Sequence, residues 1–574
     1  MAKRRKKKRI NVLPIMFLIL MGLVVGFLIA VYIKKYAPTK ETMPMEQYLD
    51  IQSDDELAII LNGRIAEKNE NDEPLAYTYE GRAVVTLDYI KDQLDDRYYF
   101  DSNENILRYT TPEKINSASA GENCYYAAGE QVELSYTPFV TVDDKICVDT
   151  EFITRFSPVT CDVYSNRVVF YTDGFVKNFY KVKRKTQLRR FGGPKSPILA
   201  EVAKGTRVAI IEDYDNWCYV ISENGELGCI KTSKIKEDEE VFAVAENEKF
   251  EENHNNLGRD ISMAFYQTTN ELANGMMMDA IADVSNVNVL CPTWFYVNDN
   301  SGGVEDLASK DIVDQCHAKG YQIWALFSNV EKSSVDYETI INTTSLREAM
   351  IKRVVSSAVA SGIDGINLDF EEISVEGGDA FIELVRELAL ACRENNLVLS
   401  VNNYVPQNYN AHYDLEEQGI FADYVVIMGY DEHTAGSDEA GSNASYPFIR
   451  DGIVDTIDKV SPEQVILALP LYSRSFYSVG GDLKCGTISI KNMEELKQSN
   501  SYEWQEDLGL NYMKYVSDTD GIEKELWLED EESLRLKFDL IREYELAGAA
   551  YWKLTFEVPY VWNLAGEYLN ADKF

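Results

Sequence analysis

The chain is poor in the residues that usually bind metals. Its 574 residues include only 4 His, and its 9 Cys form no Cys-x-x-Cys pair. Structural zinc sites use closely spaced Cys and His, so the sequence predicts no metal site and no cofactor. Several Cys stand inside apolar runs such as KICVDT from Lys145, where Cys behaves as a small hydrophobic residue.

Cationic residues are also scarce beyond the first 40 positions. Residues 1–40 carry ten Lys or Arg and no acid, so the rest of the chain has a net charge near −49, which is −39 minus 10. A surface this acidic repels phosphate groups, which argues against nucleic acid as a partner. Solubility alone would also account for the charge.

The one long hydrophobic run lies near the N-terminus. Seven basic residues precede an uncharged stretch from Ile10 to Ile33. As a helix this stretch would span about 36 Å, enough for a hydrocarbon core of about 30 Å. A cleaved signal peptide is the alternative, but the run is long for one and Pro38 spoils the nearest cleavage site. The sequence predicts a membrane anchor with its N-terminus in the cytoplasm and the remaining chain outside.

A pattern occurs twice between Gly81 and Asp173. The copies begin at Val84 and Lys145, and each predicts a short strand, a helical turn and a β-hairpin over a Ser-Asn turn. The pair resembles the N-terminal domain of copper amine oxidases, a module also found in bacterial envelope proteins. Because the copies contain no His, no copper chemistry is implied. We expect a structural or wall-contacting role.

A third segment, residues 184–238, contains five short β runs. It has a Lys-Gly-Thr turn at residues 204–206, Trp217 and a closing NGELGCI. These features resemble the bacterial Src-homology-3-type barrel of cell-wall enzymes. The resemblance implies contact with the cell wall, and a passive spacer is the alternative.

The C-terminal 320 residues predict a (β/α)₈ TIM barrel. Eight apolar, β-rich runs alternate with helical patterns such as FIELVRELALAC, and catalytic groups in such barrels sit at the C-terminal ends of strands. The gap before the last run is the longest, and NYMKYVSDTDGIEKELWLED within it predicts a hairpin insertion beside the cleft. The eight runs start near Ile261, Val287, Gln322, Gly365, Leu397, Tyr424, Val465 and Gly548.

Polar residues cluster at the end of the fourth predicted strand. In DGINLDFEE, Asn367, Asp369 and Glu371 alternate, so all three face the barrel mouth, whereas Asp364 has the opposite parity. Unpaired buried carboxylates are costly, so a purely structural role explains this spacing poorly. The spacing predicts a catalytic site.

The run from Asp364 to Glu371 matches the D-G-x-D-x-D-x-E signature of family-18 glycoside hydrolases, the chitinase family. MGYD from Met428, LPLYSR from Leu469 and Trp552 match the family's motifs on strands six, seven and eight, in that order. The resemblance covers the whole barrel. It implies an enzyme that hydrolyses bonds next to N-acetylhexosamine.

The same resemblance implies a role for each residue. Glu371 would protonate the glycosidic oxygen while the C2 acetamido group of the sugar attacks the anomeric carbon, as this family uses its substrate as nucleophile. Asp369 would orient that acetamide, Tyr430 would hydrogen-bond its carbonyl, and Trp552 would form the floor of the pocket. Asp431 and Arg474 would contact sugar hydroxyls.

Asn367 departs from the pattern, because the family has Asp there. Asn can still hydrogen-bond Asp369 and contribute to substrate binding, and peptidoglycan- and spore-type members, similar to this chain in NLDFE and MGYDEH, often carry Asn. Peptidoglycan is favoured, with chitin and N-glycans as alternatives. A non-hydrolytic glycan-binding or scaffold protein of the same fold is the rival, and the presence of Glu371 argues against it.

The predicted segments are a cytoplasmic basic tail at 1–9, a transmembrane anchor at 10–33, a stalk at 34–80, the repeat domain at 81–180, the small β-barrel at 184–238 and the catalytic barrel at 255–574.

Overall fold

The computed structural model describes residues 12–69, 71–243 and 254–574, so the predicted tail 1–9 and the first two residues of the predicted anchor lie outside the described residues. Contacts divide the chain into two compact units. The N-terminal unit comprises Met1–Tyr98, Gly121–Asn123 and Leu134–Lys249; the barrel unit comprises Tyr99–Ala120, Cys124–Glu133 and Phe250–Phe574.

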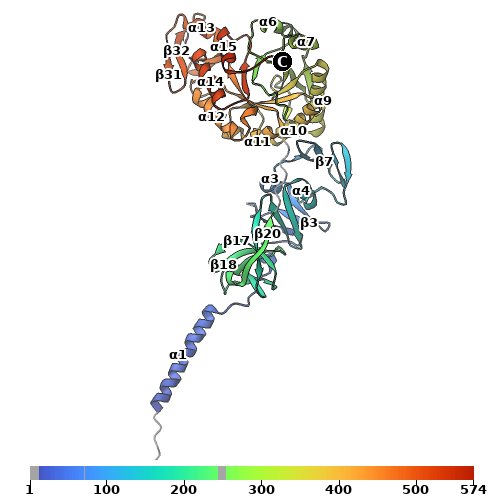
Figure 1. Ribbon diagram of the computed structural model, residues 1–574, viewed down its shortest axis with the longest axis vertical. Coiled ribbons are helices and arrows are strands. Elements are labelled where there is room, and N and C mark those ends of the chain that lie inside the picture. The colour runs from blue at the N-terminus through green and yellow to red at the C-terminus, as the bar shows by residue number, and fades with distance from the viewer. Residues whose placement is uncertain (1–11, 70, 244–253) are drawn as a thin grey trace, which may run out of the picture. The chain divides into compact units, whose positions relative to one another are not determined.

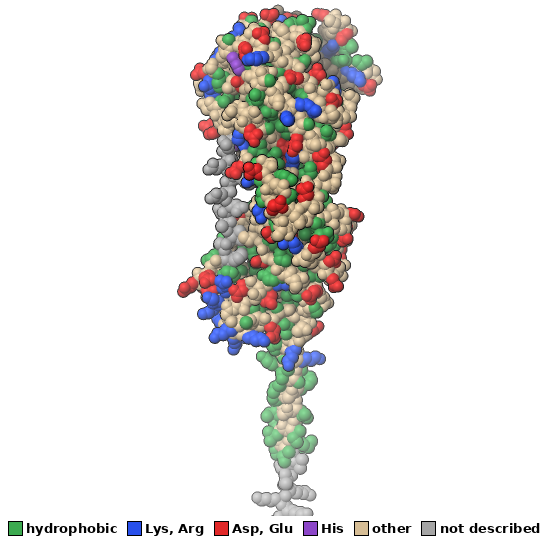
Figure 2. Space-filling view, turned by 90° about the vertical axis from the view of Figure 1, so that its right-hand side faces the viewer, with side chains coloured by type: hydrophobic (Ala, Val, Ile, Leu, Met, Phe, Trp, Pro, Cys, Tyr) green, Lys and Arg blue, Asp and Glu red, His purple; other side chains and the backbone are tan. Residues whose placement is uncertain are grey.

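The first helix, α1 (Val12–Tyr36), is apolar along its length. The segment Leu13–Tyr36 has a mean hydropathy of 2.8 and buries none of its surface within the protein. Figure 2 shows hydrophobic side chains covering its visible face. By length and composition α1 can cross a membrane, as the run after the basic tail predicted.

The N-terminal unit contains two sheets. The first has the strand order β10-β11-β4-β3-β1-β13-β12, in which β3 is Ala76–Tyr79 and β10 is Phe139–Val142. Its strand β1 (Glu56–Leu61) falls within the expected stalk, yet it is buried and pairs in parallel with β13 (Arg167–Thr172). The second sheet, β16-β15-β19-β18-β17-β14-β20, contains the expected segment 184–238 and extends it by β14 (Val176–Val182) and the end of β20 (Ile235–Ala243). Its other strands are β15 (Thr186–Arg189), β16 (Ile198–Val202), β17 (Arg207–Tyr214), β18 (Trp217–Ser222) and β19 (Leu227–Lys231).

Both copies of the repeat form the predicted elements, but their hairpins enter different sheets. In the second copy, β11 (Lys145–Asp149) and α4 (Thr150–Phe156) precede the hairpin of β12 (Val159–Tyr164) and β13, which stays in the first sheet. In the first copy, the hairpin of β5 and β6 joins the five-stranded sheet β5-β6-β7-β8-β9. The elements of the first copy and its sheet are β4 (Arg82–Thr86), α3 (Leu87–Gln93), β5 (Tyr98–Asp101), β6 (Ile106–Thr110), β7 (Ile115–Ser119), β8 (Cys124–Ala127) and β9 (Glu130–Glu133).

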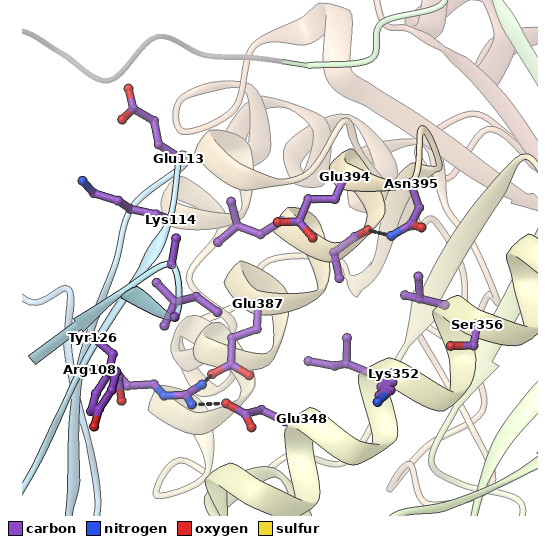
Figure 3. Close-up of a pocket in the computed structure, with 18 of the residues that line it drawn as sticks. Arg108, Glu113, Lys114, Tyr126, Glu348, Lys352, Ser356, Glu387, Glu394 and Asn395 are labelled. Carbon is purple, nitrogen blue, oxygen red and sulfur yellow. Dashed lines mark hydrogen bonds and ion pairs between the residues drawn. The ribbon is translucent and has the colours of Figure 1, made fainter. Parts of the chain in front are cut away.

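This five-stranded sheet belongs to the barrel unit through buried polar contacts (Figure 3). Arg108 on β6 is buried and pairs with Glu387 of α10 (Gly378–Glu394). Arg347 of α9 (Thr344–Ser361) donates from Nη2 to Oε1 of the same Glu387 at 2.7 Å. Thr110 donates to Glu383 Oε1 at 2.6 Å. The expected repeat domain 81–180 therefore contributes to both units.

The predicted (β/α)₈ barrel is confirmed. Its eight strands are parallel, and pairing of the first strand with the second closes the sheet into a barrel. Helices lie outside the barrel, among them α7 (Lys310–His317), α11 (Leu415–Phe421), α12 (Tyr446–Ile457) and α14 (Glu531–Glu543) (Figure 1, green to red). Along β21, Ile261, Met263 and Phe265 join the interior cluster, whereas Ala264 packs in the outer layer, as a period of two requires. The strands are β21 (Ile261–Tyr266), β22 (Val289–Asp299), β24 (Gln322–Ser328), β25 (Gly365–Asp369), β26 (Val398–Tyr404), β27 (Tyr424–Met428), β28 (Val465–Pro470) and β34 (Gly548–Trp552).

The long gap before the last barrel strand folds as a separate five-stranded sheet. Its order is β30-β29-β33-β32-β31, and β32 (Leu510–Val516) and β33 (Glu523–Leu528) form the predicted hairpin. The sheet is larger than the hairpin alone because β29 (Tyr472–Val479) follows β28 (Val465–Pro470) after a single residue and pairs with β33. It also includes β30 (Asp482–Ser489), which contributes Thr487 to the cavity described below.

Candidate active site

Strand β25 carries the predicted catalytic residues to the C-terminal end of the barrel. It begins at Gly365, where a Cβ atom would lie 2.9 Å from the Val398 carbonyl oxygen, so glycine permits close pairing with β26. Asp369 ends the strand and Glu371 follows two residues later. Asp369 is only 8% exposed.

A cavity of about 400 Å³ opens above these residues. Its walls come from the ends of four barrel strands (β25, β26, β27 and β34), from loops after the barrel strands and from the inserted sheet. Of the seven predicted site residues, it is lined by Asp369, Glu371, Tyr430, Asp431, Arg474 and Trp552.

The seventh, Asn367, is fully buried beneath the cavity and does not line it. Its Nδ2 donates to Ser400 Oγ at 2.9 Å and to Asn402 Oδ1 at 2.8 Å. Asn402 in turn donates from Nδ2 to Asp369 Oδ1 at 2.9 Å. Asn367 thus supports Asp369 through Asn402 instead of by the direct hydrogen bond we expected.

Glu371 is fixed by two neighbouring side chains. Its backbone N–H donates to Asn329 Oδ1 at 2.8 Å, and Asn329 Nδ2 donates back to the Glu371 carbonyl at 2.8 Å. The Tyr404 hydroxyl donates to Glu371 Oε2 at 2.9 Å. The carboxyl group is therefore held at the rim of the cavity with one oxygen, Oε1, free of these contacts.

Burial raises the pKa values of both carboxyl groups, and nearby negative charges add to the rise. Burial, and then the charge of Glu371, raise the pKa of Asp369 to about 8, although the Asn402 amide opposes this. Burial also raises the pKa of Glu371, and the hydrogen bond from Tyr404 partly offsets it. The pair therefore retains a proton near neutral pH, as a general acid requires.

The remaining predicted residues complete the cavity. Tyr430 is largely buried, and burial raises its pKa, so its hydroxyl stays protonated and can donate. Trp552 packs on Phe265, with 5.3 Å between ring centroids. Asp431 Oδ1 accepts from Arg474 Nη2 at 2.6 Å and from the Tyr472 hydroxyl at 2.8 Å.

Sequence reasoning missed three supporting residues: Asn329, Asn402 and Tyr404. Asn402 and Tyr404 share the parity of Ser400 on β26, so the polar tail of LVLSVNNY carried the same alternation signal as β25. Asn329 directly follows β24 and lay where barrel geometry places site residues.

The carboxyl pair lies at the C-terminal ends of the strands of a closed parallel barrel, beside a protonated tyrosine and a tryptophan. This arrangement is that of a hydrolase site in a barrel enzyme. The family model for glycosyl hydrolases family 18 matches residues 245–557, which is more than half of the chain. The chain belongs to this family and is a glycoside hydrolase.

Similar proteins include two cortex-related lytic enzymes and a di-N-acetylchitobiase. The cortical fragment-lytic enzyme of Bacillus subtilis (strain 168) is 24% identical over 262 residues, which are 43% of this chain and 60% of that protein. The di-N-acetylchitobiase of Rattus norvegicus is 24% identical over 273 residues, 42% of this chain and 72% of that protein. The crystal structure of the Bacillus cereus spore cortex-lytic enzyme SleL shares the fold, with a TM-score of 0.50 and 19% identity over 58% of this chain and 78% of SleL. This chain spans less than two thirds of the fragment-lytic enzyme's length.

Proposed function

We propose that the chain hydrolyses β-1,4 bonds next to N-acetylhexosamine in peptidoglycan by a retaining, substrate-assisted mechanism. The observation that carries the proposal is the placement of Asp369, at the end of β25, and Glu371, two residues later, in the wall of one cavity. Among the described residues, the only other carboxylate lining the cavity is Asp431, which is paired with Arg474. No carboxylate is therefore available to attack from the opposite face of the sugar, and the acetamide of the substrate fits that role.

In the first step Glu371 gives its proton to the glycosidic oxygen as that oxygen leaves the anomeric carbon. The acetamide oxygen forms the new bond to that carbon, with Asp369 accepting from the acetamide N–H and Tyr430 donating to the acetamide oxygen. In the second step the Glu371 carboxylate takes a proton from water, whose oxygen bonds to the anomeric carbon as the bond from that carbon to the acetamide oxygen breaks. Two inversions at one carbon leave the β anomer.

Two features favour peptidoglycan over chitin. The names of the bacterial relatives refer to the spore cortex, and α1 can anchor the chain in a membrane facing the wall. In this proposal residues 10–33 span the membrane, the basic tail stays inside, and the barrel lies outside. Residues 81–180, as the copper amine oxidase-like module, and 184–238, as the Src-homology-3-type module, would hold the enzyme in the wall.

Proton NMR during the first minutes of reaction tests the mechanism. We expect the β anomer to appear first, and we expect no hydrolysis when the sugar in the cleaved position is N-deacetylated. A thiazoline analogue of the cyclised intermediate should inhibit, and mass spectrometry with peptidoglycan, chitin and N-glycan side by side identifies the polymer. Initial release of the α anomer, or normal turnover of the deacetylated substrate, would contradict substrate assistance.

A further inference from the structure

The cavity contains one cation without a counter-ion. Lys553 follows Trp552 and lines the same cavity. Its ammonium group donates to Gln267 Oε1 and lies 4.9 Å from the centre of the Phe556 ring. No carboxylate in the described part of the chain forms an ion pair with it, whereas the other cation of the cavity, Arg474, is paired with Asp431.

Burying an unpaired ammonium group costs free energy unless other groups accept its hydrogen bonds. The ammonium has three donors, and Gln267 takes one of them. Burial lowers the pKa of Lys553, in line with the cost of removing its charge from water. With a net charge of −39 the chain has many acids that could have paired with it, yet none does among the residues described. Lys553 lines the same cavity as Asp369 and Glu371, where a substrate group could accept from its ammonium group.

We propose that Lys553, held by Gln267, binds a carboxylate on the sugar next to the scissile bond. This proposal rests on the hydrolase function proposed above and narrows its substrate. Chitin is neutral throughout, whereas muramic acid carries a lactyl group at O3. That lactyl carboxylate is charged only where no peptide is linked to it. Hydrolysis of the lactyl–peptide amide must therefore supply the preferred substrate before this enzyme acts.

Three glycans of equal length test the assignment. The first is a peptide-free strand of alternating N-acetylglucosamine and N-acetylmuramic acid, the second is the same strand with each lactyl group converted to its methylamide, and the third is a chitin oligomer. We expect kcat/KM for the acidic strand to exceed that for the methylamide strand by about tenfold or more, as a charge-assisted hydrogen bond provides. The preference should shrink as salt rises, since the carboxylate is mobile and exposed before binding.

Variants of Lys553 distinguish a role in binding the substrate carboxylate from a purely structural role. Lys553→Met should lower hydrolysis of the acidic strand to the level of the methylamide strand, and Lys553→Arg should keep most of the preference. Lys319→Met, at an exposed position after α7, is the matched control and should behave like the parent protein. Equal loss on all three glycans in Lys553→Met, or equal cleavage of the acidic and methylamide strands by the parent protein, overturns the assignment to Lys553. Cleavage of none of the three glycans by the parent protein defeats the hydrolase proposal itself.

Discussion

Among single residues, the proposed proton donor Glu371 has the simplest test. Glu371→Gln keeps the size of the side chain and removes only the proton that the leaving oxygen needs. We expect kcat to fall by about 10² to 10⁴, while binding of an uncleaved glycan is retained. Glu372→Gln is the matched control, because Glu372 is the next residue, is of the same type and is exposed. More than a tenth of the parent activity in Glu371→Gln would remove Glu371 from the acid role.

Tyr404 sets the pH range over which Glu371 keeps its proton. Its hydroxyl donates to Glu371 Oε2 and so favours the ionised carboxylate, which opposes the rise in pKa caused by burial. In Tyr404→Phe the pKa of Glu371 should rise, so activity should persist to a pH about one unit higher. The pH profile of kcat/KM measures this, with the exposed Tyr409→Phe as control. An alkaline limb that stays in place or moves to lower pH would contradict the role.

Asp369 and Glu371 show which parts of the site the sequence could predict. Alternation along DGINLDFEE identified Asp369 and Glu371 because Asp369 ends a short strand and Glu371 follows it within two residues. The partners of these residues come from β24 and β26, and such contacts depend on strand order and register. A single sequence predicts the strands, but it does not predict which polar ends meet.

At the scale of elements, the buried pair of Arg108 and Glu387 should make a measurable contribution to stability. Removing one member leaves a charge in a position closed to water, although Arg347 still pairs with Glu387. Arg108→Met should therefore destabilise the barrel unit by about 1–3 kcal/mol. Arg108→Met/Glu387→Gln should cost less than the sum of the two single changes.

Thermal unfolding of the four proteins of this cycle measures the coupling. Lys352→Met, at an exposed position on α9, controls for loss of a cation from the same surface. If the double variant loses the same free energy of unfolding as the two single variants added together, the two side chains do not stabilise the sheet through each other.

The two repeat copies mark the limit of element prediction. Their local patterns are alike, and both fold as strand, helix and hairpin. One hairpin pairs with β1, whereas the other packs by its polar face on α9 and α10 through contacts between residues 240 to 279 positions apart. Local periodicity determines the elements, and distant side chains determine which sheet each one joins. The burial of β1 within the expected stalk has the same origin.

For the whole molecule, the charge asymmetry around α1 leads to a test of orientation. Basic residues precede the apolar helix, and the remainder of the chain is strongly acidic, so we expect the N-terminus inside the cell and the barrel outside. Protease added to intact protoplasts should digest the barrel and spare an N-terminal tag. A barrel that survives until the cells are lysed would reverse the assignment.

The path of the chain between the two units bears on how the enzyme could be released from the cell surface. Apart from the short stretch Gly121–Asn123, the chain lies in the barrel unit from Tyr99 to Glu133, leaves it, and re-enters it at Phe250. A protease that cuts once between the units after residue 243 would leave the barrel attached, because β5–β9 stay bonded to α9 and α10 and covalently joined to the anchored half. Release of the barrel therefore requires cuts near both residue 98 and residue 134 in addition, or loss of the contacts around Glu387. If α1 anchors the chain as proposed, a single cut after residue 243 leaves the catalytic barrel held at the membrane through β5–β9.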